Sequence, residues 1–271
     1  MVSMRTAVFL TSLRGLFLVY DVMLRVRLGL GPRSAFAFMS SFQRAAARRV
    51  LSLARVYCDF RLRVTRFPGL LPRRCLLASN HQSLVDIPVL MHAFPELDLR
   101  FVAKRELRRW VPGVSMTLRS AQHALIGRKA GFAAANRALR GLARLSDLGV
   151  SPVVFPEGTR SKDGSVQRFH AAAVRVLSEA APLPILSVAV EGGYRVSRLK
   201  GLVRNLRGTS YRVAPLTLYP PARTRAELNE TLARSREEIS ATIRSWREEE
   251  MNRQPAARGR RDETGRRHRA R

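Results

Sequence analysis

Residues 75–93 read CLLASNHQSLVDIPVLMHA, and this stretch decides the fold. The short apolar run Cys75–Ser79 is typical of a buried β-strand, and Ser83–Ala93 follows with a helical pattern. His81 stands in the polar turn between them. In open α/β sheets, this is the position where ligands and catalytic groups gather. The stretch therefore predicts a strand, a functional turn and a helix.

The same alternation of strands and helices continues along the chain. Short apolar runs bounded by Gly, Pro, Asn or charged residues indicate strands, and apolar residues at three- and four-residue spacing indicate helices. Such alternation predicts one layered α/β domain with a central mixed sheet flanked by helices. Further strands are expected at Phe101–Ala103, Ala124–Ile126, Pro152–Phe155, Pro184–Val190 and Tyr211–Leu218, and further helices at Gly131–Leu145, Phe169–Ala180 and Ala226–Glu249.

Two helical segments precede this domain and form an expected N-terminal amphipathic hairpin, broken at Leu28–Pro32 by two glycines and a proline. Residues 7–24 are apolar but contain Arg14 and Asp21, which predicts a poor membrane-spanning helix. Residues 36–57 are amphipathic, with an arginine-rich polar face. The hairpin either packs on the core or lies in an anionic membrane interface, and the scarcity of acidic residues favours the interface. No convincing cleavage site follows the apolar run, so export is not expected.

Composition limits the classes of protein to consider. The chain has 271 residues, 46% of them hydrophobic, which excludes a small disulfide-stapled or wholly disordered protein. With 49 Lys and Arg against 20 Asp and Glu, the net charge of +29 predicts an anionic partner: nucleic acid, a membrane or phosphate. Cys58 and Cys75 are expected to be free buried thiols in a reducing compartment. The expected organisation is a membrane-associating hairpin over 1–60, a domain over 61–252 and a disordered basic tail over 253–271.

His81 and Asp86 are the first candidates for chemistry. Asp86 lies five positions after His81, so the imidazole can occupy the turn while the carboxylate lies in the first turns of the helix. A carboxylate pointing back at the ring would hold one tautomer of the histidine. A His–Asp pair without a serine or cysteine nucleophile suits a general base that activates a substrate's own hydroxyl. On these residues alone, an ordinary structural pair is an equal alternative.

A second polar block, Phe155-Pro-Glu-Gly-Thr-Arg-Ser161, also follows an apolar run. Glycine lets a ligand approach the backbone, and arginine beside threonine and serine supplies donors for a phosphate. Glu157 would be costly beside an anion unless it pairs with an arginine. The alternative for this block is a polar turn from strand to loop.

Together, the two blocks resemble the glycerolipid acyltransferases typified by 1-acyl-glycerol-3-phosphate acyltransferase. That family carries a His-x4-Asp block followed by a Phe-Pro-Glu-Gly-Thr-Arg-Ser block, and both are present here at full length and in that order. Phe101–Leu107 between them also looks like the family. The resemblance covers the chain from Leu70 to Val190.

Three stretches depart from the family pattern. Gln122–Arg128 keeps only Ile126 and Arg128 of the usual Gly-x-x-Phe-Ile-x-Arg block. Phe169 is not followed by the usual Lys-x-Gly, and Ser187 replaces the second proline of the fourth block. In the family, the changed blocks surround the acceptor and acyl pockets. The departures leave the expected chemistry intact, but they leave the identity of the acceptor lipid undetermined.

The resemblance implies an O-acyltransferase of phospholipid biosynthesis. It implies transfer from acyl-CoA or acyl carrier protein to the free hydroxyl of a lysophospholipid, foremost lysophosphatidate to phosphatidate, with no metal and no further cofactor. His81 would be the general base and Asp86 would orient and stabilise its imidazolium. The implied acceptor phosphate site consists of Arg128, Glu157, Gly158, Thr159 and Arg160.

Other readings of the sequence remain. The acceptor can be another lyso-lipid, including an aminoacyl lyso-lipid. A catalytically inactive membrane scaffold of the same fold is disfavoured because His81 and Asp86 are intact. A nucleic-acid-binding protein fits the charge but lacks a visible recognition module. The expected location is the cytoplasmic face of the inner membrane, as a peripheral or monotopic protein.

Overall fold

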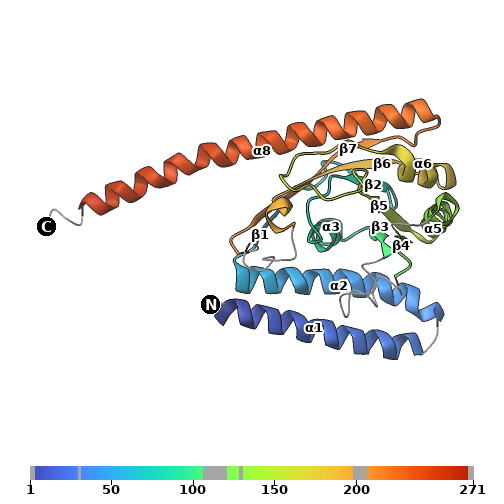
Figure 1. Ribbon diagram of the computed structural model, residues 1–271, viewed down its shortest axis with the longest axis horizontal. Coiled ribbons are helices and arrows are strands. Elements are labelled where there is room, and N and C mark those ends of the chain that lie inside the picture. The colour runs from blue at the N-terminus through green and yellow to red at the C-terminus, as the bar shows by residue number, and fades with distance from the viewer. Residues whose placement is uncertain are drawn as a thin grey trace.

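A computed structural model describes residues 4–29, 32–105, 121–127, 131–197, 205 and 207–267. Two long N-terminal helices precede a region in which strands and helices alternate (Figure 1). The elements are α1 (Met4–Gly29), α2 (Pro32–Cys58), β1 (Arg61–Val64), β2 (Leu76–Ser79), α3 (Asp86–Ala93), β3 (Asp98–Lys104), β4 (Ala124–Ile126), α5 (Phe132–Arg144), η2 (Leu145–Leu148), β5 (Val150–Val154), α6 (Ala171–Ala180), β6 (Ile185–Glu191), η3 (Gly193–Val196), β7 (Ser210–Tyr219) and α8 (Arg225–Arg267).

The strands form one mixed sheet in the order β1-β7-β6-β2-β5-β3-β4. Every pair is parallel except β6 with β7, which is antiparallel. The α/β class with a mixed sheet and flanking helices is therefore confirmed. In the centre of the sheet, β2 pairs with β5 on one side and β6 on the other, all three parallel. Their carboxyl ends consequently meet at one edge.

Helices cover both faces of the sheet, because successive side chains of a buried strand point to opposite faces. Leu77 of β2 shares a buried cluster with Leu51 of α2 and Leu90 of α3. Its neighbour Leu76 belongs to a second cluster with Leu142 of α5 and Leu232 of α8. The α1–α2 pair and α8 therefore lie on opposite sides of the sheet (Figure 1).

The expected hairpin is present, and α1 corrects one expectation about it. α1 packs against α2, and α2 packs against α3. Residues Met4–Arg27 form a helix long and apolar enough to cross a membrane by length and composition, although a poor spanning helix was predicted. Residues 7–24 contain only two charged residues, Arg14 and Asp21, and their other side chains are apolar enough to outweigh these charges on average. Only 17% of the apolar window is buried, so α1 is not an ordinary core helix.

Two further elements differ from the sequence expectations. The edge strand β1 was missed because RLRV is short and half arginine, without an apolar run. α8 runs to Arg267, whereas a helix to Glu249 and a disordered tail from residue 253 were expected. The extension contains Pro255, Gly259 and Gly265, which are poor helix formers, so the helix propensity of its residues does not account for it.

Candidate active site

The site residues come from the loops that follow β2, β5 and β6, the three central parallel strands. His81 follows β2, the turn Phe155–Ser161 follows β5, and Glu191 ends β6 before Gly193. The two sequence blocks, far apart in the chain, therefore meet at one edge of the sheet, as expected for the carboxyl ends of parallel strands.

His81 and Asp86 form a hydrogen-bonded dyad. The imidazole Nδ1 lies 2.8 Å from Asp86 Oδ2, and the Asp86 side chain is fully buried. The same Oδ2 accepts the backbone N–H groups of Gln82 at 2.7 Å and Ser83 at 2.8 Å. These N–H groups hold the carboxylate aimed at the ring. With Nδ1–H donated to Asp86, the other ring nitrogen, Nε2, is left as the basic atom.

The ring of His81 is also fixed from its face. It stacks on Phe155 with centroids 3.9 Å apart and an interplanar angle of 13°. The side chain keeps 14% of its surface exposed, so a substrate can reach it. Among the described residues, no hydrogen-bond partner of Nε2 is found. A ring held at one nitrogen and open at the other has the geometry of a general base.

The Phe155–Ser161 turn is locked to the His81 loop on both sides. Glu157 Oε1 accepts the backbone N–H of His81 at 2.9 Å, and the carbonyl of His81 accepts the N–H of Ser161 at 2.8 Å. Gly158 adopts a φ of 66°, the left-handed region that favours glycine, and its N–H donates to the Phe155 carbonyl at 3.0 Å. The second block thus fixes the backbone position of the histidine.

Residues 64–191 match the Acyltransferase family model, a range that contains both blocks. The chain carries an Acyltransferase-family domain. Two plant proteins described as 1-acyl-sn-glycerol-3-phosphate acyltransferase, from Limnanthes douglasii and Cocos nucifera, are each 30% identical over 154 residues. This is 56% of the present chain and 51% and 46% of theirs, so the chain spans about half the length of the curated relatives it matches. The homology is distant.

One solved structure supports the fold of this acyltransferase domain. It is the crystal structure of the 1-acyl-sn-glycerophosphate (LPA) acyltransferase PlsC from Thermotoga maritima, with a TM-score of 0.57 and 24% sequence identity. The match covers 88% of the present chain and 98% of that one. At this identity, the likeness speaks for the fold alone, and it extends well beyond the residues matched by the family model.

Within the acyltransferase domain, the residues expected to bind phosphate have different surroundings. Glu157 is buried and its carboxylate faces backbone N–H groups, with Oε2 accepting from Gln167 at 3.3 Å. Arg160 is half-buried and donates to the Ser197 carbonyl at 3.0 Å, while Thr159 is exposed. Arg128 lies outside the described residues. Glu157 is therefore a positioning residue, the Gly158 N–H is used within the turn, and the Arg160 and Thr159 side chains are the described groups available to a ligand.

The electrostatics of Glu157 follow from its burial. Loss of hydration raises the pKa of its carboxyl to about 7, and the Asp86 charge acts in the same direction. The N–H groups of His81 and Gln167, with the Arg236 charge, pull the other way and lower the pKa. An arginine partner was the condition under which Glu157 could lie beside an anion, and among the described residues the carboxylate is instead bound by backbone N–H donors.

Sequence reasoning missed a layer of residues behind the dyad. The Tyr211 hydroxyl donates to Asp86 Oδ1 at 3.2 Å, and burial with the Asp86 charge raises the pKa of the phenol well above its usual value, so it stays a donor. Gly193 leaves room for this contact, because a Cβ there would lie 2.5 Å from the Tyr211 oxygen and 2.8 Å from Asp86 Oδ1. Neither residue carries a local sequence signal, since both come from distant strand ends.

A second missed set ties Gln82 to α8. The amide oxygen of Gln82 accepts the Gly193 N–H at 2.8 Å, and its nitrogen donates to Glu191 Oε2 at 2.7 Å. Glu191 in turn receives Arg247 of α8, at 2.7 Å from Nε to Oε1. Through this relay, α8 helps to fix the residue next to the catalytic candidate. Among the described residues, no group of three His, Cys, Asp or Glu side chains is arranged to hold a metal ion.

Proposed function

We propose that this chain transfers an acyl group from an acyl thioester, on coenzyme A or acyl carrier protein, to the free hydroxyl of a lysophospholipid. The preferred acceptor is lysophosphatidate and the product is phosphatidate. The observation that carries the proposal is the His81–Asp86 dyad, with 2.8 Å between Nδ1 and Oδ2. The His81 ring, with its Nε2 free, stacks on Phe155 at the start of the Phe155–Ser161 turn, which we propose binds the acceptor phosphate. The family of the domain supports the reaction class.

His81 acts as the general base. Its Nε2 takes the proton of the acceptor hydroxyl as the oxygen attacks the thioester carbonyl, which forms a C–O bond and a tetrahedral intermediate. Collapse of the intermediate breaks the C–S bond, and the imidazolium returns its proton to the leaving thiolate. Asp86, held by two backbone N–H groups and Tyr211, stabilises the positive charge on the ring between these steps.

The turn after β5 orients the acceptor. Arg160 has guanidinium N–H groups beyond the one donated to Ser197, and Thr159 offers an exposed hydroxyl. Arginine suits a phosphate because its planar fork donates two parallel charge-assisted hydrogen bonds. Binding the phosphate here holds the hydroxyl of the same small molecule within reach of His81.

The protein acts at a membrane. α1 carries exposed apolar side chains along most of its length, which suits burial among acyl chains, and the basic surface suits anionic lipids. We propose the cytoplasmic face of the inner membrane, where acyl thioesters are made and a two-tailed product leaves directly into the leaflet.

The test is an acceptor screen with the purified full chain. A radiolabelled acyl thioester is offered with lysophosphatidate, other lysophospholipids and an aminoacyl lyso-lipid, and the products are identified by mass spectrometry. We expect phosphatidate to form fastest, with no product in the His81→Ala variant. A different preferred acceptor would correct the substrate, and no acyl product with any acceptor would overturn the proposed activity.

A further inference from the structure

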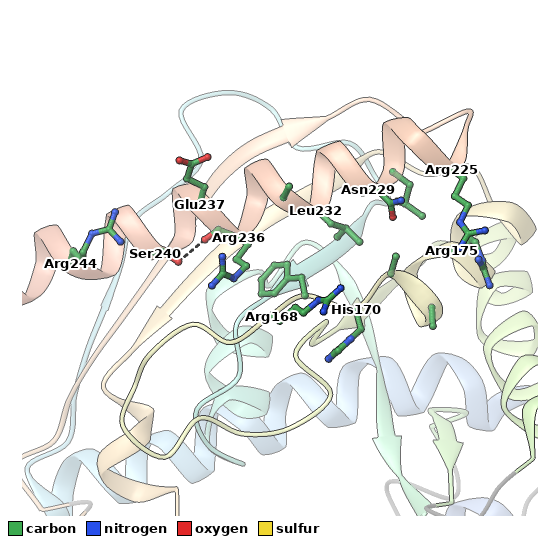
Figure 2. Close-up of a pocket in the computed structure, with 15 residues that line it drawn as sticks. Arg168, His170, Arg175, Arg225, Asn229, Leu232, Arg236, Glu237, Ser240 and Arg244 are labelled. Carbon is green, nitrogen blue, oxygen red and sulfur yellow. Dashed lines mark hydrogen bonds between the residues drawn. The ribbon is translucent and has the colours of Figure 1, made fainter.

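A long basic groove lies on the α6–α8 side of the domain (Figure 2). Its cavity measures about 1200 Å³ and runs between α8 and the segment that leads into α6. Figure 2 shows arginines arranged along both of its sides. α8 contributes Arg225, Arg236 and Arg244, α6 contributes Arg175, and the loop before α6 contributes Arg168. The lining contains one acidic residue, Glu237.

Most of this positive charge is free to meet a partner. Arg168, Arg225 and Arg244 are exposed and make no ion pair or hydrogen bond with any described residue. Arg175 lies 3.7 Å from Glu179, and Arg236 donates to the Gln167 carbonyl at 3.0 Å. An excess of unpaired arginine around a concave surface raises the local concentration of anionic ligands.

The shape of the groove favours a helix over a small anion. Arg225 and Arg244 are nineteen positions apart on α8, which spans about 28 Å at 1.5 Å per residue. This is far longer than a phosphate group, and the cavity is larger than a usual small-molecule pocket. Leu228 and Leu232 also line it, but they belong to the buried core, so arginines dominate the accessible surface. A basic groove of this length matches the acidic face of a helix laid along it.

The position of the groove favours a soluble partner over a lipid surface. The groove is on the α8 side of the sheet, whereas the exposed apolar face of the hairpin belongs to α1 on the other side (Figure 1). A protein anchored through α1 presents the groove away from the bilayer. Anionic lipid headgroups are therefore remote from it.

The groove and the candidate active site share a wall. His170 lines the groove, and its backbone N–H donates to the Pro156 carbonyl at 2.8 Å. The residue before Pro156 is Phe155, on which the His81 ring stacks. Arg236 of the groove also holds Gln167, whose N–H donates to Glu157. A partner bound in the groove therefore contacts the segment that packs directly against the Phe155–Ser161 turn beside His81.

We propose that this groove docks an acidic amphipathic helix of the soluble carrier protein that delivers the acyl thioester. The inference rests on the proposed function, since it assigns the donor to a carrier protein and gives that carrier a binding surface. The carrier's thioester arm then passes beside the Phe155–Ser161 turn to reach His81.

The test compares two donors on the full chain and a groove variant. The variant is Arg168→Glu with Arg225→Glu and Arg244→Glu. The matched control is Arg66→Glu with Arg73→Glu and Arg137→Glu, exposed arginines outside the groove with no described partner. We expect the groove variant to raise KM for acylated acyl carrier protein at least about tenfold, because three attractive charges become repulsive. In the groove variant, kcat/KM for acyl-CoA stays within about twofold of the wild-type value. In the control variant, KM for acylated acyl carrier protein and kcat/KM for acyl-CoA both stay within about twofold of wild type.

A binding experiment distinguishes the proposed docking surface from the proposed acyltransferase activity. The binding of fluorescent acyl carrier protein to the full chain is measured by fluorescence anisotropy. Binding that is lost in the groove variant and kept in the control supports the docking surface even if no transfer is seen, in which case the proposed activity alone fails. Transfer from acyl-CoA without any carrier binding overturns the docking surface alone. Equal loss with both donors also overturns it, because the groove then serves a part of coenzyme A or the fold.

Discussion

His81 divides its two ring nitrogens between two tasks, with Nδ1 bound to Asp86 and Nε2 open to a substrate. General-base assistance of this kind is worth about 10²- to 10⁴-fold in rate. We expect His81→Ala to lower kcat by that factor with saturating substrates. Asp86→Asn should cost less, because an amide oxygen still accepts the N–H groups of Gln82 and Ser83 and keeps the ring near its place.

The control for this prediction is His92→Ala, an exposed histidine of α3 in the same segment of chain. It should leave kcat unchanged. A His81→Ala enzyme that keeps half of the wild-type rate would refute the general-base mechanism.

We expect Arg160 to bind the acceptor phosphate and not the thioester. A charge-assisted hydrogen bond contributes about 1.5 to 3 kcal/mol, so Arg160→Ala should raise the acceptor KM about ten- to hundredfold while the thioester KM changes little. Arg160→Lys should restore part of the loss, because lysine keeps the charge without the fork. Initial rates over both substrate concentrations measure this.

Lys162→Ala is the matched control, since Lys162 is exposed two positions further along the same loop. If Arg160→Ala weakened both substrates equally, its bond to the Ser197 carbonyl would be its main role and the residue would support the fold.

Separation along the chain explains which site residues could be predicted. His81 and Asp86 lie within one strand–turn–helix unit, so local pattern and hydrogen-bonding chemistry were enough to pair them. Tyr211 reaches Asp86 from 125 positions away, and its only sequence signal was that of a strand residue. Contacts that depend on strand order cannot be read from a single sequence before the order is known.

At the scale of elements, the two loops after β2 and β5 behave as one unit. Glu157 and Ser161 bind both backbone groups of His81, which couples its position to the protonation of Glu157. Burial raises the pKa of Glu157 to about 7 from an ordinary 4.5. Its contribution to stability is therefore complete below pH 4.5 and is lost as the pH rises through 7.

This predicts a pH dependence that a substitution removes. Between pH 4.5 and pH 8, the free energy of unfolding of the wild type should fall by about 3 kcal/mol relative to Glu157→Gln. Denaturant titrations of both proteins at the two pH values measure it. His123, whose pKa burial lowers to about 3, titrates alike in both proteins and cancels. Parallel pH profiles would contradict the prediction.

Elements were predicted well where burial dictated the residue pattern. β2, β5 and β6 are buried on both faces and are almost entirely apolar, which is why their strands and the edge carrying the site were expected. β1 lies at the sheet edge, where arginines are tolerated, and its four residues lack such a pattern. The end of α8 was missed for a related reason, since a helix beyond its docking surface shows no apolar stripe.

At the scale of the whole molecule, the exposed apolar face of α1 and the basic groove lie on different sides of the sheet. α1 exposes an apolar face that contains Leu18, Val19 and Val22, each more than half exposed. The basic groove lies across the sheet on the α8 side. This arrangement suits a protein that takes its lipid from one side and its thioester carrier from the other. It also separates apolar burial in the membrane, which salt does not screen, from electrostatic attraction to the arginines, which salt does screen.

Membrane binding through α1 should resist salt. Attraction of arginines to anionic lipid is about 1 kcal/mol each and is screened within about 10 Å at moderate salt, whereas apolar burial is not screened. Three apolar side chains of α1 contribute together about 5 kcal/mol when buried among acyl chains. High-salt washing should therefore leave the full chain on membranes, and truncation after Asn252 should leave it there with its activity.

The variant Leu18→Asp with Val19→Asp and Val22→Asp should make the protein releasable by salt. These side chains are exposed in the fold, so circular dichroism should be unchanged and the protein keeps its core. The matched control, Leu70→Asp with Phe132→Asp and Leu148→Asp, changes three exposed apolar residues outside α1 and should stay bound. Sedimentation of membranes before and after the wash gives the bound fraction. Because charge alone cannot hold a protein in high salt, release of the unmodified chain by salt would mean that α1 does not enter the bilayer.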